Sequence, residues 1–509
     1  MNLLKTIQDY SQRFEHRLAV RSEDGEITYG ELEAWSNRLA AVLSRTGTDR
    51  RPVLVYGHKD PWMIVCFLAC VKSGRAYCPV DCSVPLERVR AIVRCLAPSF
   101  ILAVEPLQLD GISAQNPKTL AWQSRPEDCV PVEENWVKEE DLFYLIFTSG
   151  STGDPKGVQI TRSCLEHYLD WSCSLAAEPA QQTGEVCRVF LNQAPFSFDL
   201  SVMDLYTCLA CGGTLWTLSK QVQGDFSLLF SSLKKSQASV WVSTPSFADL
   251  CLSDTAFDRQ LLPRLETFLF CGETLSNKTA EKLLERFPKS RVINTYGPTE
   301  STVAVTQVPV TEQMAKEPSP LPVGIPKPGT EIEIWDAQGN PLPPGEKGEI
   351  VILGDTVSTG YFGRDDLTQK AFFQRQQGEI LVRGYHTGDL GYLDEQGMLF
   401  YCGRMDLQVK LHGYRIELGD IENNLMRLPE VQAAAVLPKE ENGVVKSLTA
   451  FVVLEPQQEK GFAATQQLKK ALKGYLPDYM IPKKFVYLEQ MPMTSNGKAD
   501  RKTLKGEWM

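Results

Sequence analysis

The chain has 509 residues, which is too long for one hydrophobic core and predicts about two to four structural units. The formal net charge of −10 argues against general nucleic-acid binding, which requires a basic face, and 43% hydrophobic with 23% charged residues is typical of a globular protein. The longest strongly apolar run, 62–71, is too short for a membrane span, and segment 1–17 lacks the apolar stretch of a secretory signal, so we expect a cytoplasmic protein without membrane insertion.

The 14 cysteines are expected to be reduced, because the chain has no recognisable export signal. Cys208 and Cys211 have a spacing that occurs in redox and zinc sites, but they lie in an apolar stretch without a second pair or a nearby histidine. We interpret both as packing residues and expect no metal site built from protein ligands alone.

Helices and strands alternate through the N-terminal part of the chain. Thr28 and Glu31 have the spacing of a capping box and predict the start of an amphipathic helix. Further strands are predicted at 53–56, 100–104, 142–147, 239–242, 267–270 and 291–294, and further helices at 62–72, 88–96 and 278–286. Such alternation predicts an α/β fold of doubly wound parallel sheets with helices on both faces.

The composition changes near Pro318 and again near Gly403. Segment 329–361 is strand-like and rich in turns, which indicates a β-rich subdomain at about 318–403. The residues after 403–406 have the pattern of a compact α+β region. We therefore expect a large N-terminal domain, 1–405, and a small, mobile C-terminal domain, 406–509.

A loop of glycines and hydroxyl side chains follows the predicted strand 142–147. Glycine lets backbone N–H groups approach an anion, Thr148 and Ser149 add hydroxyl donors, and Lys156 adds a positive charge, which is the chemistry of a polyphosphate site. It is not a Walker A loop, because Pro155 stands where the second glycine belongs and Gly157 follows the lysine.

Polar residues follow two other predicted strands in the same way. Cys271-Gly272-Glu273 comes after strand 267–270, and the segment 296–300 comes after strand 291–294. Because ligands of open α/β sheets bind at the carboxyl ends of the strands, we expect these segments and Thr148 to converge on one edge.

The string 148–157, together with Asn294-Thr295-Tyr296-Gly297-Pro298-Thr299-Glu300, resembles the motifs of the adenylate-forming ligase superfamily, which includes acyl-CoA synthetases, luciferases and peptide-synthetase adenylation domains. The resemblance implies ATP and Mg²⁺ as cofactors, with Tyr296 stacked on adenine, Asn294 at its edge and Glu300 holding Mg²⁺. An aromatic face suits a purine, and a carboxylate suits a hard cation.

Two later motifs and one lysine extend the resemblance. Asp389, in 385–389, matches the aspartate that accepts hydrogen bonds from both ribose hydroxyls, and Arg404, in 401–404, matches an arginine at the ribose or phosphate. Lys498 matches the lysine that neutralises the carboxylate and α-phosphate during adenylation, where a positioned cation stabilises the transition state. The ATP-binding residues implied are Thr148, Ser149, Gly150, Lys156, Asn294, Thr295, Tyr296, Gly297, Pro298, Thr299, Asp389, Tyr401, Cys402, Gly403, Arg404 and Lys498, with Lys498, Thr148 and Glu300 catalytic.

The segment 196–205 places Asp199 among apolar residues, where an unpaired carboxylate is costly. In amino-acid-activating members of the superfamily the matching aspartate pairs with the substrate ammonium, although Asp199 could instead pair with a protein cation, and Asp204 is an alternative. Besides Asp199 and Lys498, the substrate site is expected to include Met203, Cys271 and Val303, with Cys271 keeping the pocket small.

Segments 196–206, 243–247, 268–273 and 414–417 resemble, more narrowly, the ligases that activate D-alanine and load it onto a carrier protein. The resemblance implies formation of D-alanyl-AMP and transfer to the phosphopantetheine thiol of a separate carrier, the first step of teichoic acid D-alanylation, with Asp406 as the hinge of the C-terminal domain. Two alternatives stay open: a stand-alone adenylation enzyme for L-Ala, Gly or Ser, and a non-catalytic nucleotide-binding scaffold.

Overall fold

The computed structural model describes residues 1–45, 49–109, 113–124, 132–149, 155–176, 187–405, 408–441, 444–458, 460–493 and 499–508. They form two compact units. The first comprises Met1–Cys82, Leu96–Ile146 and Gly157–Gly403, and the second comprises Ser83–Cys95, Phe147–Lys156 and Arg404–Met509.

The first sheet of the larger unit has six strands in the order β6-β5-β3-β4-β7-β8, and its pairs from β6 to β7 are parallel. Its strands are β3 (Val53–Gly57), β4 (Tyr77–Asp81), β5 (Phe100–Ala103), β6 (Ala114–Gln115), β7 (Leu142–Thr148) and β8 (Lys156–Thr161). The capping box predicted at Thr28 and Glu31 forms at the start of α2 (Tyr29–Arg45), where Thr28 N donates to Glu31 Oε2 at 2.9 Å and Glu31 N donates to Thr28 Oγ1 at 3.2 Å. Helix α2 packs on α3 (Trp62–Lys72), which is apolar on all sides and buried, and on α5 (Pro117–Trp122).

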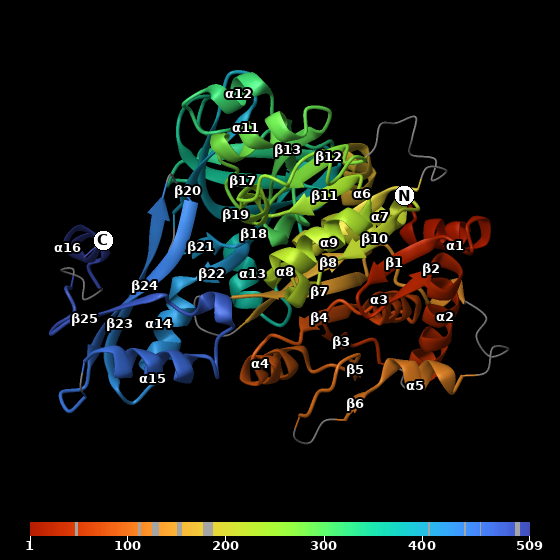
Figure 1. The fold of residues 1–509 in the computed structure, drawn as a ribbon, viewed down its shortest axis with the longest axis horizontal. Coiled ribbons are helices and arrows are strands. Elements are labelled where there is room, and N and C mark those ends of the chain that lie inside the picture. Colours follow the sequence, from red (N-terminus) through yellow and green to blue (C-terminus); the bar gives the residue numbers. More distant parts are fainter. Residues whose placement is uncertain are drawn as a thin grey trace. The chain divides into compact units, whose positions relative to one another are not determined.

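The second sheet has nine strands in the order β15-β14-β13-β12-β11-β9-β10-β1-β2 (Figure 1). The parallel strands are β1 (Leu18–Ser22), β9 (Val189–Asn192), β10 (Thr214–Thr217), β11 (Val240–Ser243), β12 (Thr267–Phe270) and β13 (Arg291–Tyr296), and antiparallel strands β2 (Gly25–Thr28), β14 (Thr306–Pro309) and β15 (Ile325–Pro326) lie at its ends. Its helices are α1 (Leu3–Arg13), α6 (Arg162–Ala176), α7 (Leu200–Ala210), α8 (Lys220–Gly224), α9 (Phe226–Ser236), α10 (Pro245–Leu252), α11 (Asn277–Arg286) and α12 (Glu312–Lys316). The predicted α/β fold with parallel sheets is confirmed.

The β-rich part follows in the same unit. It contains β16 (Thr330–Trp335), β17 (Gly348–Gly354), β18 (Phe372–Gln377), β19 (Ile380–Leu393) and β20 (Leu399–Arg404), with α13 (Asp365–Ala371) between β17 and β18. The strands pair antiparallel in the order β16-β17-β19-β18, and β20 pairs with β19. Tyr296 and Val305 pack into the apolar core of this sheet, so the nucleotide motif of β13 is anchored against it.

The smaller unit contains α4 (Leu86–Leu96), a hairpin and a three-stranded sheet. The hairpin joins β21 (Gln408–Leu411) to β22 (Tyr414–Glu417), and the sheet has the order β23-β24-β25, with β23 (Val431–Glu441), β24 (Val444–Leu454) and β25 (Lys484–Tyr487). Helices α14 (Leu418–Met426), α15 (Phe462–Leu472) and α16 (Arg501–Trp508) complete it. Inside this unit Arg88 of α4 forms an ion pair of 3.0 Å with the fully buried Asp420 of α14.

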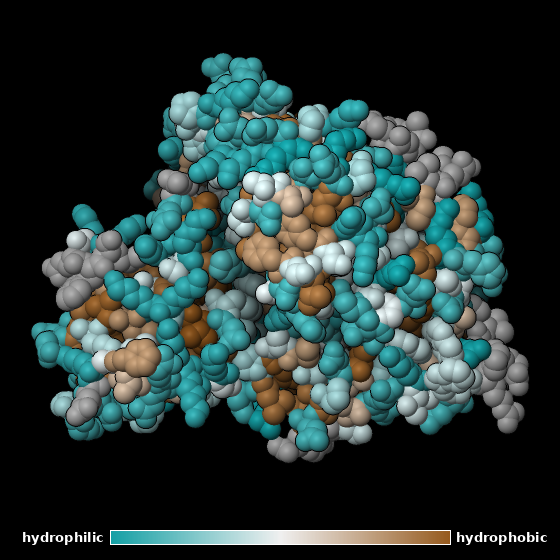
Figure 2. Space-filling view, viewed as in Figure 1, coloured by the Kyte–Doolittle hydropathy of each residue, from teal (hydrophilic) through white to brown (hydrophobic). Residues whose placement is uncertain are grey.

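The surface in Figure 2 is mostly hydrophilic, with hydrophobic residues in a few small groups. Of the helices in the described ranges, none combines the length and the apolar character that crossing a membrane requires.

Candidate active site

The carboxyl ends of two neighbouring parallel strands in the second sheet carry two of the three predicted polar segments. Cys271 follows β12 and Gly297 follows β13, whereas Thr148, the third, ends β7 of the six-stranded sheet. Residues distant in the chain are thus brought to one edge, as the strand pattern predicted for the segments at Cys271 and Tyr296.

A buried hydrogen bond joins two of the predicted nucleotide residues. Tyr296 Oη donates to Asp389 Oδ2 at 2.6 Å, and the ring of Tyr296 lies 5.9 Å from the ring of Tyr401. Burial, and then the negative charge of Asp389, raises the pKa of Tyr296 well above its ordinary value, so its hydroxyl remains a donor at any physiological pH. Asn294 Nδ2 donates to Pro322 O at 2.8 Å, which fixes the amide beside the same strand.

Glu300 is fully buried in the short 3₁₀ turn Thr299–Ser301. Its Oε1 accepts a hydrogen bond of 2.7 Å from Tyr361 Oη. The hydroxyl of Ser301 is buried and has no hydrogen-bond partner in the described part of the chain. A buried carboxylate next to an unsatisfied hydroxyl is an arrangement that a bound cation or polar ligand would complete.

The backbone after Glu300 is strained. Thr302 and Val303 are β-branched, yet both have left-handed backbones with φ of 59° and 69°. Close packing enforces this turn, because a Cβ atom on Gly297 would lie 2.5 Å from the Cα of Ala304. Strain of this kind persists where the surrounding structure fixes it, and it clusters at ligand sites.

Of the predicted substrate residues, Asp199, Met203, Cys271 and Val303 are described, and all four lie in the larger unit. Asp199 is buried at the start of α7, Met203 is on the first turn of that helix, and the Cys271 thiol donates to Val303 O at 3.7 Å. Met203, Cys271 and Val303 belong to one apolar cluster. The alternative carboxylate, Asp204, is fully buried; its Oδ1 accepts a hydrogen bond of 2.7 Å from Asn192 Nδ2, whereas its Oδ2 has no hydrogen-bond partner among the described residues.

The phosphate-loop residues belong to the smaller unit. Thr148 ends β7, and its Oγ1 is buried without a hydrogen-bond partner among the described residues. A ligand that accepts a hydrogen bond could satisfy it. Ser149 Oγ donates to Arg415 O at 2.8 Å and accepts from Glu417 N at 3.1 Å. Lys156 Nζ lies 4.0 Å from Glu417 Oε1, so strand β22 contacts both Ser149 and Lys156.

The remaining predicted residues divide into two groups. Thr295, Pro298, Thr299, Cys402, Gly403 and Arg404 are described, and all lie in the strands and turns named above. Gly150, Asp406 and Lys498 lie outside the described residues, so their predicted roles stay predictions.

Sequence reasoning missed Tyr361. It lies in the turn after β17, 61 positions from Glu300, and no local motif marks it as a partner of that carboxylate. The fold creates the contact, and only an experiment or a structure reveals it.

Comparison with known proteins shows the family of this chain. The sequence pattern of the AMP-binding enzyme family matches residues 7–362, and that of the AMP-binding enzyme C-terminal domain matches residues 420–498. The chain is 48% identical to a D-alanine–D-alanyl carrier protein ligase of Bacillus licheniformis, over 100% of this chain and 99% of that protein.

Two solved structures share the fold. One is holo-PA1221, an NRPS protein containing adenylation and PCP domains bound to a vinylsulfonamide inhibitor, with a TM-score of 0.81 and 26% identity over 99% of this chain and 84% of that chain. The other is the Vibrio cholerae adenylation domain AlmE in complex with glycyl-adenosine-5'-phosphate, with a TM-score of 0.80 and 23% identity over 99% of this chain and 98% of that chain. With its matched family patterns and its relatives over the full length, this chain belongs to the family of AMP-binding enzymes, and those relatives are ligases.

Proposed function

We propose that this chain activates D-alanine with ATP and transfers it to the phosphopantetheine thiol of a separate carrier protein. The full-length relatives at 46–48% identity are named as ligases for this reaction, which supports the proposal. The structural observation that supports it is a buried carboxylate, Asp199, at the start of α7, in the same unit as the buried pair Cys271 and Val303. A carboxylate in a tight apolar site suits the ammonium of a small amino acid.

In the first step, a carboxylate oxygen of D-alanine attacks the α-phosphorus of ATP, and pyrophosphate leaves. Thr148, Ser149 and Lys156 would bind the phosphates, and Asp389, oriented by Tyr296, would accept hydrogen bonds from the ribose. Lys498 would neutralise the charge that builds up on the reacting oxygens.

Glu300 fits the role of a Mg²⁺ ligand. Its carboxylate is a hard oxygen donor, its orientation is fixed by Tyr361, and Mg²⁺ in such sites takes one or two carboxylates together with phosphate oxygens. When bound, the ion would neutralise charge on the ATP phosphates.

In the second step, the carrier thiol attacks the carbonyl carbon of D-alanyl-AMP, and AMP leaves. The site must first exclude water and then admit a long thiol arm, so we propose a rotation of the C-terminal domain between the steps with its hinge at Asp406. Asp406→Pro, which fixes φ, should leave pyrophosphate exchange intact and block carrier loading. Carrier loading at the wild-type rate in this variant would place the hinge elsewhere.

The test of the whole proposal is ATP–pyrophosphate exchange with D-alanine, L-alanine, glycine and L-serine, followed by mass measurement of a loaded carrier. We expect the highest kcat/KM with D-alanine. A preference for another amino acid would assign the chain to a different adenylation specificity, and ATP binding without any exchange would support the scaffold alternative. We propose that the protein acts in the cytoplasm, because the enzymes that its sequence resembles start teichoic acid D-alanylation there.

A further inference from the structure

Two tyrosine hydroxyls in the interior of the larger unit have no hydrogen-bond partner within the described ranges of the chain. Tyr144 of β7 and Tyr168 of α6 are both fully buried, and neither hydroxyl has a hydrogen-bond partner among the residues described. The tyrosines Tyr29 and Tyr206, buried to the same degree, donate to Gly213 O and Tyr77 Oη. Because an unmade hydrogen bond in the interior is costly, two such hydroxyls in one region need an explanation.

The neighbouring contacts place Tyr168 beside the candidate substrate site. Ser172 of α6 and Thr207 of α7 share a hydrogen bond of 2.8 Å. The thiol of Cys173, one residue after Ser172, interacts with the thiol of Cys211, four residues after Thr207. Both contacts advance toward the C-terminal ends, so the two helices run in the same direction. One turn back from Ser172 on α6 is Tyr168, and one turn back from Thr207 on α7 is Met203. Helix α6 also packs against β12, which ends directly before Cys271.

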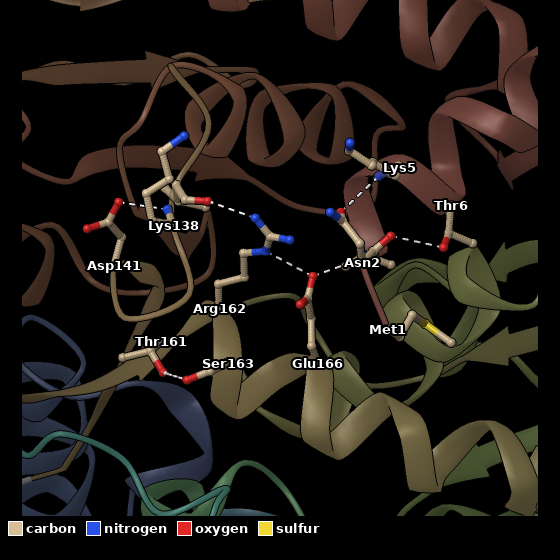
Figure 3. Close-up of polar contacts among 12 residues, drawn as sticks. Met1, Asn2, Lys5, Thr6, Lys138, Asp141, Thr161, Arg162, Ser163 and Glu166 are labelled. Carbon is tan, nitrogen blue, oxygen red and sulfur yellow. Dashed lines mark hydrogen bonds and ion pairs between the residues drawn. The ribbon is translucent and has the colours of Figure 1, made fainter. Parts of the chain in front are cut away.

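The opposite face of α6 is fixed to the N-terminal segment (Figure 3). Glu166 Oε1 accepts hydrogen bonds from Arg162 Nε at 2.9 Å and from Leu3 N at 3.0 Å, and the N-terminal ammonium forms an ion pair of 3.2 Å with Asp170. The helix is therefore held on both faces.

Electrostatic interactions agree with this placement. Burial raises the pKa of Tyr168 well above its ordinary value, and the groups that add to this effect are, in order, Cys271, Tyr144, Asp199 and Asp204. For Tyr144 the first such group after burial is Asp199. The Tyr168 hydroxyl thus lies near both Cys271 and Asp199, and the Tyr144 hydroxyl lies near Asp199.

We infer that Tyr168, with Tyr144 nearby, hydrogen-bonds a hydroxyl on the substrate side chain, so that the same site activates D-serine as a second substrate. The inference rests on the proposed function, which places the ammonium at Asp199 and the α-carbon near Cys271. The methyl group of D-alanine leaves the Tyr168 hydroxyl unsatisfied, whereas a hydroxymethyl group supplies its partner. The chemistry is unchanged: a carboxylate oxygen of D-serine attacks the α-phosphorus, and pyrophosphate leaves.

The experiment compares D-serine with D-2-aminobutyrate, which has a methyl group in place of the hydroxyl and nearly the same size. ATP–pyrophosphate exchange is measured with both, and with D-alanine, for the full-length wild type, Tyr168→Phe and Tyr144→Phe. Tyr10→Phe is the matched control, because its buried hydroxyl donates to Ala210 O and not to the substrate site.

The wild type should prefer D-serine to D-2-aminobutyrate in kcat/KM, and Tyr168→Phe should lower that ratio by about tenfold or more, because a site that hydrogen-bonds a substrate hydroxyl rejects the analogue without it. Tyr10→Phe should keep the wild-type ratio. Two results would overturn the inference: a wild-type preference for D-2-aminobutyrate, or a ratio that Tyr168→Phe leaves unchanged. Either would be expected of an apolar pocket, or of a pocket in which a trapped water satisfies the tyrosines. Failure of the proposed function is distinct, because the wild type would then not activate D-alanine.

Discussion

The hydrogen bond between Tyr296 and Asp389 gives a prediction that separates two roles of one side chain. Tyr296→Phe keeps the aromatic ring but removes the donor that holds Asp389, a carboxylate with only 2% of its surface exposed. A hydrogen bond to a charged group contributes about 1.5–3 kcal/mol, and about 1.4 kcal/mol corresponds to a factor of ten in affinity. We therefore expect the KM for ATP to rise by about 10- to 100-fold.

The assay is ATP–pyrophosphate exchange with ATP varied at saturating D-alanine, and then with D-alanine varied at saturating ATP. The KM for D-alanine should stay near its wild-type value, because Tyr296 holds Asp389, the predicted partner of the ribose, and not Asp199, the predicted partner of the substrate ammonium. Tyr10→Phe, which removes a buried hydroxyl elsewhere in the same unit, is the control. An unchanged KM for ATP, or an equal rise in both KM values, would refute the assignment of this hydrogen bond to nucleotide binding.

Three further predictions concern separate groups. Lys498→Ala should lower adenylation by orders of magnitude and spare transfer from pre-formed D-alanyl-AMP, and equal loss in both half-reactions, measured by exchange and by carrier loading, would remove it from the first step alone. Cys271→Ala should reduce the preference for D- over L-alanine by about 1–3 kcal/mol in exchange assays, and an unchanged ratio would exclude Cys271 as a determinant of selectivity. Burial lowers the pKa of Lys59 from 10.5 to about 8 in the folded protein. Between these pH values the unfolded chain therefore binds more protons than the folded protein. As the pH increases from about 8 to about 10, the free energy of unfolding of the wild type should rise relative to that of Lys59→Met. Urea titrations at several pH values test this, and a difference independent of pH would contradict it.

The sequence predicted those helices and strands that short local runs of residues determine. The strand at 267–270 and the helix at 62–72 have the predicted bounds, because short apolar runs between turn residues leave few other solutions. Asp199 directly precedes α7 and Cys271 directly follows β12, so both motif residues lie at the ends of secondary-structure elements. The roles of the site residues stay predictions.

Features created by tertiary packing could not be read from the sequence. Thr302 and Val303 favour extended backbones, yet packing of Gly297 against Ala304 holds both in the left-handed region. Tyr168 has the pattern of an ordinary core residue on an amphipathic helix, and only the three-dimensional structure reveals that its hydroxyl has no partner in the described part of the chain.

The position of β1 in the nine-stranded sheet affects how the chain is made. Val20 of β1 pairs with Leu215 of β10, so β1 can form this pairing only after a further 195 residues have been synthesised. At roughly 5–20 residues per second on the ribosome, this delay is on the order of 10–40 s. During that time the exposed edge of the β1–β2 hairpin can pair with other chains, and the sheet that carries the nucleotide and substrate residues cannot close. Ribosome-bound chains that end shortly before β10 should therefore be more sensitive to protease in segment 18–28 than chains released after it.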